Sequence, residues 1–246
     1  MFLLQRILLI TLLLITPFCL LSALEPAACM DRLPKQEEAL FVLKDRTNGR
    51  DVGRLTESLE LEDRYGLEVY VLKRRFDGPV LEMETIEFEK KSFIPISAKR
   101  IHKVRGMDVV TEIQFQATKA ILTVREPELL GGKTSTSLVD IPRGAVTIQQ
   151  LPYLLRCQPL HEGDEYHFQI VPLFAATSEA VEAIAHVTKG MGDSDSTVDE
   201  VEIELMLGED IYSVHFAVGE IFPLKQSSFP FSCTDSLSGL ELLFLK

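Results

Sequence analysis

The chain has 246 residues, and 25 lysines and arginines against 37 aspartates and glutamates give it a formal net charge of −12 at pH 7. Nucleic acid is a poor partner for such a chain, because its phosphates would meet an excess of negative charge. Hydrophobic residues make up 46% of the sequence and charged residues 25%, which is typical of globular proteins and excludes a largely disordered chain. This length allows a single β-rich domain.

The first residues have the pattern of a secretory signal peptide. Arg6 precedes an apolar run over Ile7–Ile15, and the small residues Ser22 and Ala23 follow. We predict a signal peptide over residues 1–23, with an end at residue 28 as the alternative, and therefore an exported protein of the periplasm or cell envelope. A retained membrane anchor is the competing interpretation, because about 20 apolar residues span a bilayer.

Four cysteines bear on the same question. Cys19 lies inside the predicted signal peptide, and Cys29 is a candidate for lipidation as the first residue of a mature bacterial lipoprotein. Cys157 and Cys233 would then remain, either as a disulfide or as two buried thiols. Attachment to the membrane is expected only if Cys29 is lipidated or the N-terminal segment is retained.

The polar character of residues 30–65 predicts an N-terminal polar segment that precedes a single β-rich domain over residues 66–246. Within the polar segment, Glu37–Asp45 is predicted to be a short amphipathic helix. Its apolar residues would share one side of that helix, and they are Ala39, Leu40, Val42 and Leu43.

A β-hairpin is predicted directly after Gly66. Leu67–Lys73 is rich in β-branched and aromatic residues, and a turn over residues 76–79 leads into a second strand over Pro79–Lys90. The second strand has apolar residues on both parities. We therefore expect a bulge that shifts its phase near the middle.

Three more strands and a loop follow the hairpin. The strands are predicted over Ser92–Val104, Asp108–Gln116 and Lys119–Arg125, and their short connections indicate a meander. Residues Glu126–Ala145 are rich in Gly, Pro, Ser and Thr, which predicts a loop.

The clearest helical pattern covers Val146–Cys157, where Pro152 predicts a kink or a restart. Ala180–Lys189 has a helix as the alternative to a strand. The remaining strands are predicted over Glu165–Phe174, Val181–Thr188, Val198–Leu207, Asp210–Val218 and Gly239–Leu245. The expected fold class is mainly β, with a curled antiparallel sheet or open β-barrel and one or two helices.

An acidic cluster suggests a calcium loop, because hard oxygen ligands stand at alternate positions. Its members are Asp193, Asp195, Thr197, Asp199 and the later Glu204. Val198 stands where such a loop needs glycine. The favoured interpretation is a polar turn followed by a half-buried strand in which glutamates alternate with apolar residues, so no metal site is predicted.

Other catalytic patterns are incomplete. Gly131–Thr134 resembles the end of a phosphate-binding loop, but Pro127 replaces its first glycine, and we expect a surface loop. The histidines are dispersed, at positions 102, 161, 167, 186 and 215, and no Gly-x-Ser-x-Gly elbow accompanies them. The sequence therefore predicts no catalytic residues and no cofactor, and a hydrolase site assembled across the fold is the less favoured alternative.

Phenylalanines crowd the C-terminal third of the chain, at positions 216, 222, 229, 231 and 244. A curled sheet lined by such residues beside a leucine-rich helix would hold an acyl chain or another hydrophobic ligand. The simpler interpretation is that these side chains fill the core.

One stretch resembles a bacterial family of exported β-sheet proteins of unknown function. The resemblance consists of a helix ending in Leu-Arg, a Pro-Leu step, a Gly turn and a strand, carried by Leu151, Leu154, Leu155, Arg156, Pro159, Leu160, Gly163, Asp164 and Tyr166. It extends loosely over residues 60–245. The resemblance implies a cell-envelope location and an open barrel similar in shape to lipoprotein-carrier proteins, and it brings no catalytic residues.

The leading hypothesis is therefore an exported, non-enzymatic protein of the cell envelope that binds a hydrophobic ligand. The alternative is a protein-interaction or scaffold module of the envelope that uses sheet edges and the acidic face.

Overall fold

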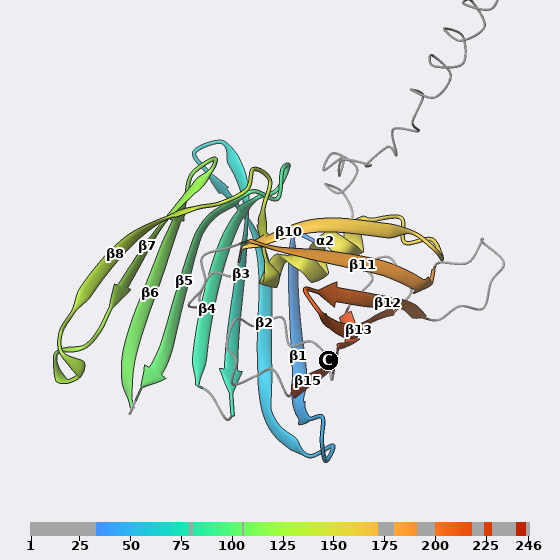
Figure 1. The fold of residues 1–246 in the computed structure, drawn as a ribbon, viewed down its shortest axis with the longest axis horizontal. Helices are drawn as coiled ribbons and strands as arrows, with labels where there is room; N and C mark the ends of the chain where they lie inside the picture. The colour runs from blue at the N-terminus through green and yellow to red at the C-terminus, as the bar shows by residue number, and fades with distance from the viewer. Residues whose placement is uncertain are drawn as a thin grey trace, which may run out of the picture.

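The structure is a computed structural model in which the strands of the chain pair in one continuous sheet (Figure 1). It describes residues 33–78, 81–104, 106–171, 180–190, 200–217, 224–227 and 240–244. Fifteen strands are found in these residues, so the chain is mainly β, as predicted.

The first eight strands follow one another as a meander. Each pairs antiparallel with the next along the chain. Their bounds are β1 Gln36–Asp45, β2 Asp51–Arg64, β3 Leu67–Asp77, β4 Glu82–Glu89, β5 Pro95–Val104, β6 Met107–Phe115, β7 Lys119–Arg125 and β8 Thr134–Asp140.

The remaining strands continue the sheet on the other side of β1. Strand β15 pairs with β1 and with β14, and so joins the two halves of the sheet, while the short β9 pairs parallel with β10 at the far edge. Their bounds are β9 Val146–Thr147, β10 Glu165–Val171, β11 Val181–Lys189, β12 Glu200–Leu207, β13 Asp210–Ala217, β14 Leu224–Ser227 and β15 Leu240–Phe244.

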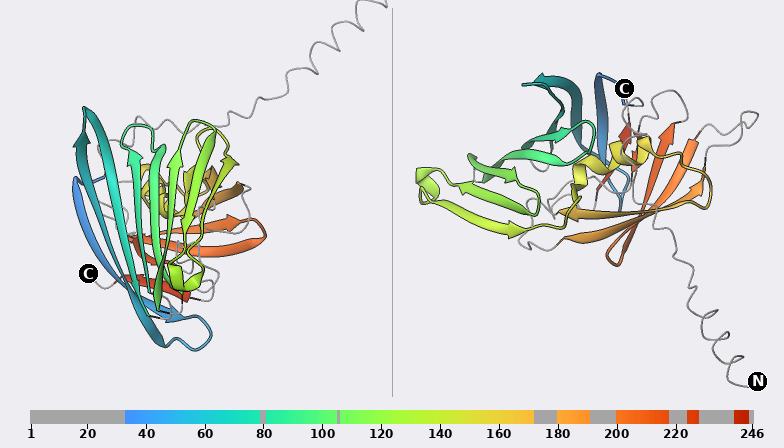
Figure 2. Two further views of the ribbon diagram at one scale, coloured as in Figure 1. Left: turned by 90° about the vertical axis from the view of Figure 1, so that its left-hand side faces the viewer. Right: turned by 90° about the horizontal axis from the view of Figure 1, so that it is seen from above.

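The sheet curls strongly, so that β10–β13 are steeply inclined to β2–β8 and the helix α2 (Leu151–Cys157) lies between the two halves (Figures 1 and 2). The curl gives the sheet an inner face that encloses the helix and an outer face that is turned to solvent. Alternation along β3 shows this division: Tyr70, Leu72 and Phe76 are buried on the inner face, whereas Lys73 and Arg75 are exposed.

The helix begins with a 3₁₀ turn over Ile148–Gln150 and continues as α2, with Pro152 in its first turn, where the missing N–H costs nothing. The Thr147 backbone N–H donates to Gln150 Oε1 at 2.8 Å, which closes the N-terminal end. The predicted helix is thus confirmed from the 3₁₀ turn to Cys157, whereas Val146 and Thr147, which the prediction included, form β9.

Several predicted strands are confirmed. The hairpin of β3 and β4, the meander through β7, and the strands β10, β12 and β13 all form near the predicted positions. Val181–Lys189 is a strand, so the helical alternative at Ala180–Lys189 is wrong. Its alanines at positions 183 and 185 are fully buried, where a small side chain suits close packing under the curled sheet.

The helix predicted over Glu37–Asp45 is wrong, because these residues belong to β1. Phe41, Val42 and Leu43 are all buried there, since the centre of the strand is covered on both faces. A strand buried on both faces loses its alternation, and this made the pattern resemble a helix. The boundary placed between residues 65 and 66 falls in the turn of the β2–β3 hairpin.

The bulge predicted in the middle of Pro79–Lys90 is also wrong. Strand β4 pairs with β3 without a register shift from Glu82 to Glu89, and Glu82, Glu84, Ile86 and Phe88 all face inward. Its pairing with β5 does shift, but between Glu87 and Phe88 near the end of the strand, and this does not change which face of β4 is buried. Two glutamates remain on the buried face because arginines on the neighbouring strands pair with them. The loop predicted over Glu126–Ala145 contains β8, which begins with four Thr and Ser residues and is mostly exposed on both faces, so its sequence gives no clear alternation.

The predicted signal segment lies outside the described residues. Within the described part of the chain, no helix combines the length and apolar character that crossing a membrane requires.

Candidate binding site

A pocket of about 330 Å³ lies beside α2, where the β4–β5 turn, the segment before the helix and β10 meet. Phe93, Val146, Leu154 and Phe168 form its apolar wall and are all buried, and Ile94 at the mouth is 46% exposed. A pocket of this size and character lies at the lower end of the range that small ligands occupy, roughly 300–1,000 Å³.

The β4–β5 turn brings Phe93 into this wall in a strained conformation. Its φ is 56°, in the left-handed region that a bulky side chain rarely adopts. The Phe93 backbone N–H donates to the Glu89 carbonyl at 2.8 Å, and Gln150 Nε2 donates to the Phe93 carbonyl at 2.7 Å. The centroid of the Phe88 ring lies 5.2 Å from the centroid of the Phe93 ring. Contacts from both the helical segment and strand β4 therefore keep Phe93 in its strained conformation.

Polar groups stand around the apolar wall. Ser92, Gln158, His167 and Gln169 line the pocket, and Gln158 Nε2 donates to the Leu154 carbonyl at 3.2 Å. In mostly apolar binding sites, a small number of polar groups of this kind orients the ligand.

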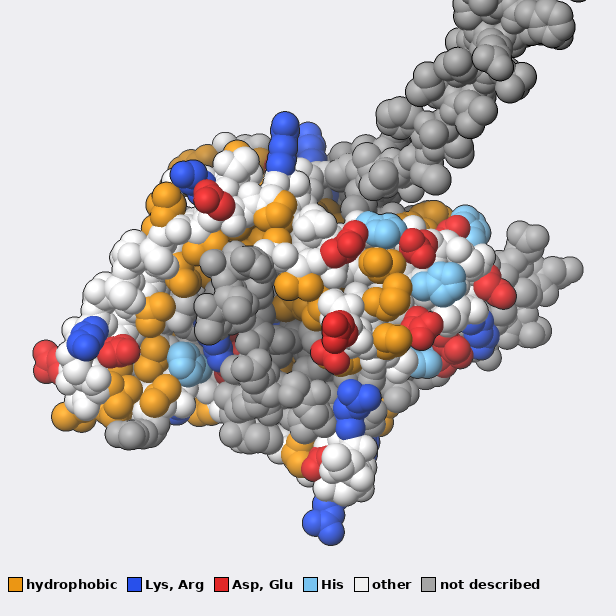
Figure 3. All heavy atoms as spheres, in the orientation of Figure 1, with side chains coloured by type: hydrophobic (Ala, Val, Ile, Leu, Met, Phe, Trp, Pro, Cys, Tyr) orange, Lys and Arg blue, Asp and Glu red, His pale blue; other side chains and the backbone are white. Residues whose placement is uncertain are grey.

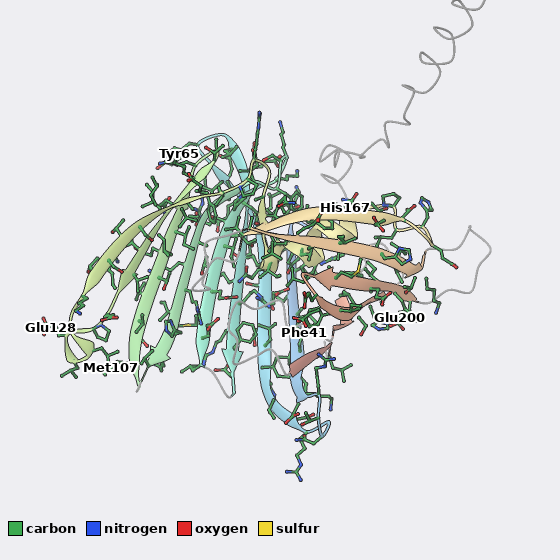
Figure 4. The ribbon with its side chains drawn as sticks, viewed as in Figure 1. Phe41, Tyr65, Met107, Glu128, His167 and Glu200 are labelled. Atoms are coloured by element: carbon green, nitrogen blue, oxygen red, sulfur yellow. The ribbon has the colours of Figure 1, made fainter. Side chains whose placement is uncertain are left out.

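His167 borders the pocket and also belongs to the outer face of β10. Its Nδ1 lies 3.1 Å from Glu182 Oε1 and its Nε2 lies 2.7 Å from Glu165 Oε1. The hydrogen bonds with Glu182 and then Glu165 raise the pKa of His167, because both carboxylates favour the imidazolium. Figure 4 shows His167 on β10, far from Phe41 at the centre of the sheet.

On the other side of α2, four adjacent strands carry an alternating row of charges on the inner face of the sheet. Glu57 on β2, Arg74 on β3, Glu84 on β4 and Arg100 on β5 stand opposite one another in register. We call these four residues the charge ladder. Directly opposed strand residues lie close enough for such pairs to interact.

The ladder is held by short contacts with almost no exposure to solvent. Arg74 Nε lies 2.8 Å from Glu57 Oε2, and Arg74 Nη1 lies 2.9 Å from Glu84 Oε2. Arg100 Nη2 reaches Glu82 Oε2 at 2.6 Å. The side chains of Glu82 and Glu84 are 0% exposed and that of Arg74 is 1% exposed.

Helix α2 and the turn before it rest on the ladder. Gln149 Nε2 donates to Glu84 Oε1 at 3.1 Å, and the Tyr153 hydroxyl donates to Glu57 Oε1. Arg156 Nη2 lies 2.8 Å from Glu37 Oε2 on β1. Burial and then the Glu57 carboxylate raise the pKa of Tyr153 well above its usual value, so this hydroxyl stays a donor.

The electrostatic consequences concentrate on β4 and β5. Burial raises the pKa of Glu84 to about 7, with Arg74 opposing the rise and Glu82 adding to it. Burial and then Arg100 lower the pKa of His102, with Glu82 opposing. Near pH 7 the ladder therefore contains a carboxyl group, that of Glu84, that is ready to take up a proton, and the imidazole of His102, which stands opposite Glu82, is largely neutral.

The geometry favours binding over catalysis at these two places. Glu82 and Glu84 have no exposed surface through which a substrate would reach them, whereas the pocket is accessible and apolar. One face of α2 touches the pocket through Leu154 and Gln158. The residues that rest on the ladder come from the same short helix and its first turn.

Several predicted site residues lie beyond the described residues. These are Cys29, Cys233, Asp193, Asp195, Asp199 and the phenylalanines at positions 222, 229 and 231. Cys157 on α2 is in a disulfide, and its pairing with Cys233 stays a prediction. Phe216 is fully buried in the core. Gly131 and Gly132 form the turn that follows a 3₁₀ helix over Glu128–Leu130, and Thr134 begins β8, so no helix follows to bind a phosphate.

Two features were not predicted from the sequence: the charge ladder, and the presence of three histidines on one face of the sheet. His167, His186 and His215 share the outer face of β10–β13 with five glutamates, which are Glu165, Glu182, Glu200, Glu202 and Glu204. Figure 3 shows acidic and histidine side chains gathered around apolar ones on this face. Strand pairing alone brings these histidines together, because they lie on three separate strands. Within the described residues, no group of three or more His, Cys, Asp and Glu side chains is arranged to hold a metal ion.

Comparison of the chain with protein-family models, curated proteins and solved structures finds no match.

Proposed function

We propose that this protein is an exported cell-envelope protein without catalytic activity that binds a small hydrophobic ligand, such as a single acyl chain, in the pocket beside α2. The observation that carries the proposal is the pocket of about 330 Å³ with an apolar wall and a polar rim. Its wall includes the strained Phe93, and strain of this kind collects at functional sites.

Two features support export. The predicted signal peptide over residues 1–23 has the composition of a secretory signal. Cys157 is in a disulfide, and disulfides persist mainly in oxidising compartments such as the periplasm. Lipidation of Cys29 would add attachment to the membrane, and the mass of the mature N-terminus distinguishes it from cleavage after Ala23.

The pocket is tested by filling it. Replacing Ile94 with tryptophan at the mouth adds bulk where the side chain is 46% exposed, so the core is not overpacked. We expect the purified mature protein to bind a fluorescent fatty acid and the Ile94→Trp variant to bind it at least about tenfold more weakly, a loss of about 1.4 kcal/mol.

Ile211→Trp is the matched control, because Ile211 is 57% exposed on the outer face of β13. This variant should bind the probe like the unmodified protein. Equal binding by Ile94→Trp, or no binding by the unmodified protein together with an absence of extractable acyl chains, would overturn the proposal.

A second candidate function is a protein-interaction module of the envelope. Ile184, Met206 and Ile211 stand in register across β11–β13 as an apolar row on the outer face. Glutamates at positions 165, 182, 202 and 204 surround this row, which suits a partner with a basic, partly apolar surface. Crosslinking in cells should then yield a heteromeric species that Ile211→Glu abolishes. Recovery of the monomer alone would contradict this function.

A further inference from the structure

Two fully buried carboxyl groups stand side by side on β4. Glu82 and Glu84 both face inward at successive buried positions of β4, and the neighbouring Glu82 helps to raise the pKa of Glu84. A hydrogen bond between two carboxyl groups requires a proton on one of them, because ionised carboxylates only accept. Among the described residues, Glu82 Oε1 is buried and has no hydrogen-bond partner, so a proton between the two carboxyl groups would satisfy it.

The charges around this pair also leave room for one proton. Strands β1–β5 and helix α2 direct seven charged side chains into this buried cluster. The carboxylates are Glu37, Glu57, Glu82 and Glu84, and the guanidinium groups are Arg74, Arg100 and Arg156. Four negative charges against three positive ones leave a net charge of −1 if all are ionised. A single proton on the pair makes the cluster neutral, and burial favours the neutral form.

The two neighbouring titratable groups, His102 and Tyr153, do not neutralise the cluster instead of this proton. The lowered pKa of His102 keeps its imidazole neutral near pH 7, and the raised pKa of Tyr153 keeps its hydroxyl protonated. Burial places the pKa of Glu84 at about 7, which agrees with a proton held by the pair in mildly acidic solution.

The pair is linked to the pocket through the helix. Gln149 donates to Glu84 and the Tyr153 hydroxyl to Glu57, while Leu154 and Gln158 of the same helical segment line the pocket. Any change that lifts the helix from the ladder must therefore change the pocket wall.

We propose that Glu82 and Glu84 share one proton that keeps α2 seated on the charge ladder, and that its loss at higher pH loosens the helix and weakens binding in the pocket. When the proton leaves, the buried cluster carries an uncompensated negative charge. Letting water reach the ladder relieves that charge, and this requires α2 to move. The inference rests on the proposed binding function of the pocket.

The first test measures binding of an uncharged fluorescent alkyl probe to the mature protein at pH 5.5 and pH 8. A probe without ionisable groups is needed because a fatty acid would titrate in the same range. We expect binding at pH 8 to be about tenfold weaker, the equivalent of one pKa unit. Equal affinity at the two pH values overturns the inference and leaves the pocket in place, whereas no binding at either value overturns both.

The Glu82→Gln variant removes the need for a proton. Its amide oxygen still accepts from Arg100, its amide nitrogen donates to Glu84, and three carboxylates then face three arginines at every pH. We expect it to bind the probe equally at pH 5.5 and pH 8. His167 at the pocket rim also titrates, so a pH dependence that persists in Glu82→Gln but disappears in His167→Gln would assign it to the rim and contradict the inference.

Glu87→Gln is the matched control on the same strand. Glu87 faces outward, pairs with Arg64 at 2.6 Å and is 20% exposed, so this variant should keep the pH dependence of the unmodified protein.

A second readout does not depend on any ligand or variant. Hydrogen exchange of the α2 amides, corrected for the intrinsic pH dependence of exchange, reports whether the helix loosens. We expect protection over Leu151–Cys157 to fall between pH 5.5 and pH 8 in the unmodified protein, while protection in β11 stays constant. Constant protection of α2 would overturn the inference.

Discussion

Strand pairing aligns charged side chains in two places, in the charge ladder on the inner face of β2–β5 and on the acidic outer face of β10–β13. The first row is buried and the second is exposed. In the ladder, Glu57, Arg74 and Glu84 stand in register with at most 12% of any side chain exposed. On the outer face, Glu202 stands opposite His215 in the same way, but Glu202 is 41% exposed.

The difference teaches what burial does to a charged row. In the low dielectric of the interior, each ladder charge depends on its partners, because a buried ion without them cannot be replaced by water. On the outer face, water and salt solvate each charge independently, so a partner adds little. Register alone therefore does not tell whether a charged row holds the fold together.

The largest effect is expected from breaking the ladder at Arg74. Arg74→Ala leaves Glu57 and Glu84 buried without the guanidinium that pairs with both. We expect the free energy of unfolding to fall by about 3–5 kcal/mol, as for other buried pairs that lose one member. Denaturant unfolding followed by circular dichroism measures the loss.

The neighbouring Arg75 supplies the control, because it faces solvent and pairs with the exposed Asp77 within its own strand. Arg75→Ala should leave the unfolding midpoint nearly unchanged. Similar losses in the two variants would show that burial does not separate the two kinds of row.

The next effect is a pH dependence that belongs to Glu84. Its folded pKa of about 7 lies above the ordinary value of 4.5, so between these values the folded protein binds more protons than the unfolded chain. The stabilisation is thus complete below about pH 4.5 and is lost as pH rises through 7, on the order of 3 kcal/mol. Unfolding of the unmodified protein should show this decline.

Glu84→Gln should remove that decline relative to the unmodified protein, and it is the slope with pH that is compared, since the variant also weakens the pair with Arg74. His102 acts in the opposite direction, because its lowered pKa makes stability rise with pH. A slope unchanged in Glu84→Gln would mean that Glu84 titrates normally and that the ladder is hydrated.

The sequence predicted the meander and the helix because their patterns are local. Strands such as β7 alternate or carry β-branched residues, and Ile148, Leu151, Leu154 and Leu155 recur at helical spacing. The wrong helix at Glu37–Asp45 has a physical cause: the centre of β1 is buried on both faces, and this removes the alternation that distinguishes a strand.

The ladder was out of reach for a different reason. On β4 the charged Glu82 and Glu84 are buried, whereas the apolar Met83 between them is 44% exposed. This is the reverse of the usual pattern, and it led to the wrong prediction of a bulge. Only Arg74 and Arg100 on the neighbouring strands explain it, and their registers depend on the whole sheet. The pocket likewise combines residues from three distant segments, and its one local signal, the positive φ of Phe93, is not visible in the sequence.

A smaller effect is expected where the helix meets the ladder. Tyr153→Phe removes the hydroxyl that donates to Glu57 Oε1 and leaves a mostly buried carboxylate oxygen without this donor. We expect a loss of roughly 1–2 kcal/mol in the free energy of unfolding. Tyr65→Phe, at a fully exposed turn, should cause no measurable loss. If Tyr153→Phe also leaves the free energy of unfolding unchanged, the hydrogen bond from α2 to the ladder does not stabilise the packing of the helix.

The smallest effect is expected on the outer face, at His167. Its pKa is raised by Glu182 and Glu165, so its contribution is complete below the ordinary value of 6.5 and is lost as pH rises through the raised pKa. The side chain is 41% exposed, and solvent screening limits the contribution to below about 0.5 kcal/mol. His167→Gln should therefore lower stability slightly at pH 5.5 and not at pH 8.5, and 1 M salt should remove even that difference, because it shortens the screening length to about 3 Å. The pH dependence of Glu84 should survive the same salt, since ions do not enter the buried ladder. A salt response of equal size at both sites would show that the two rows share one environment.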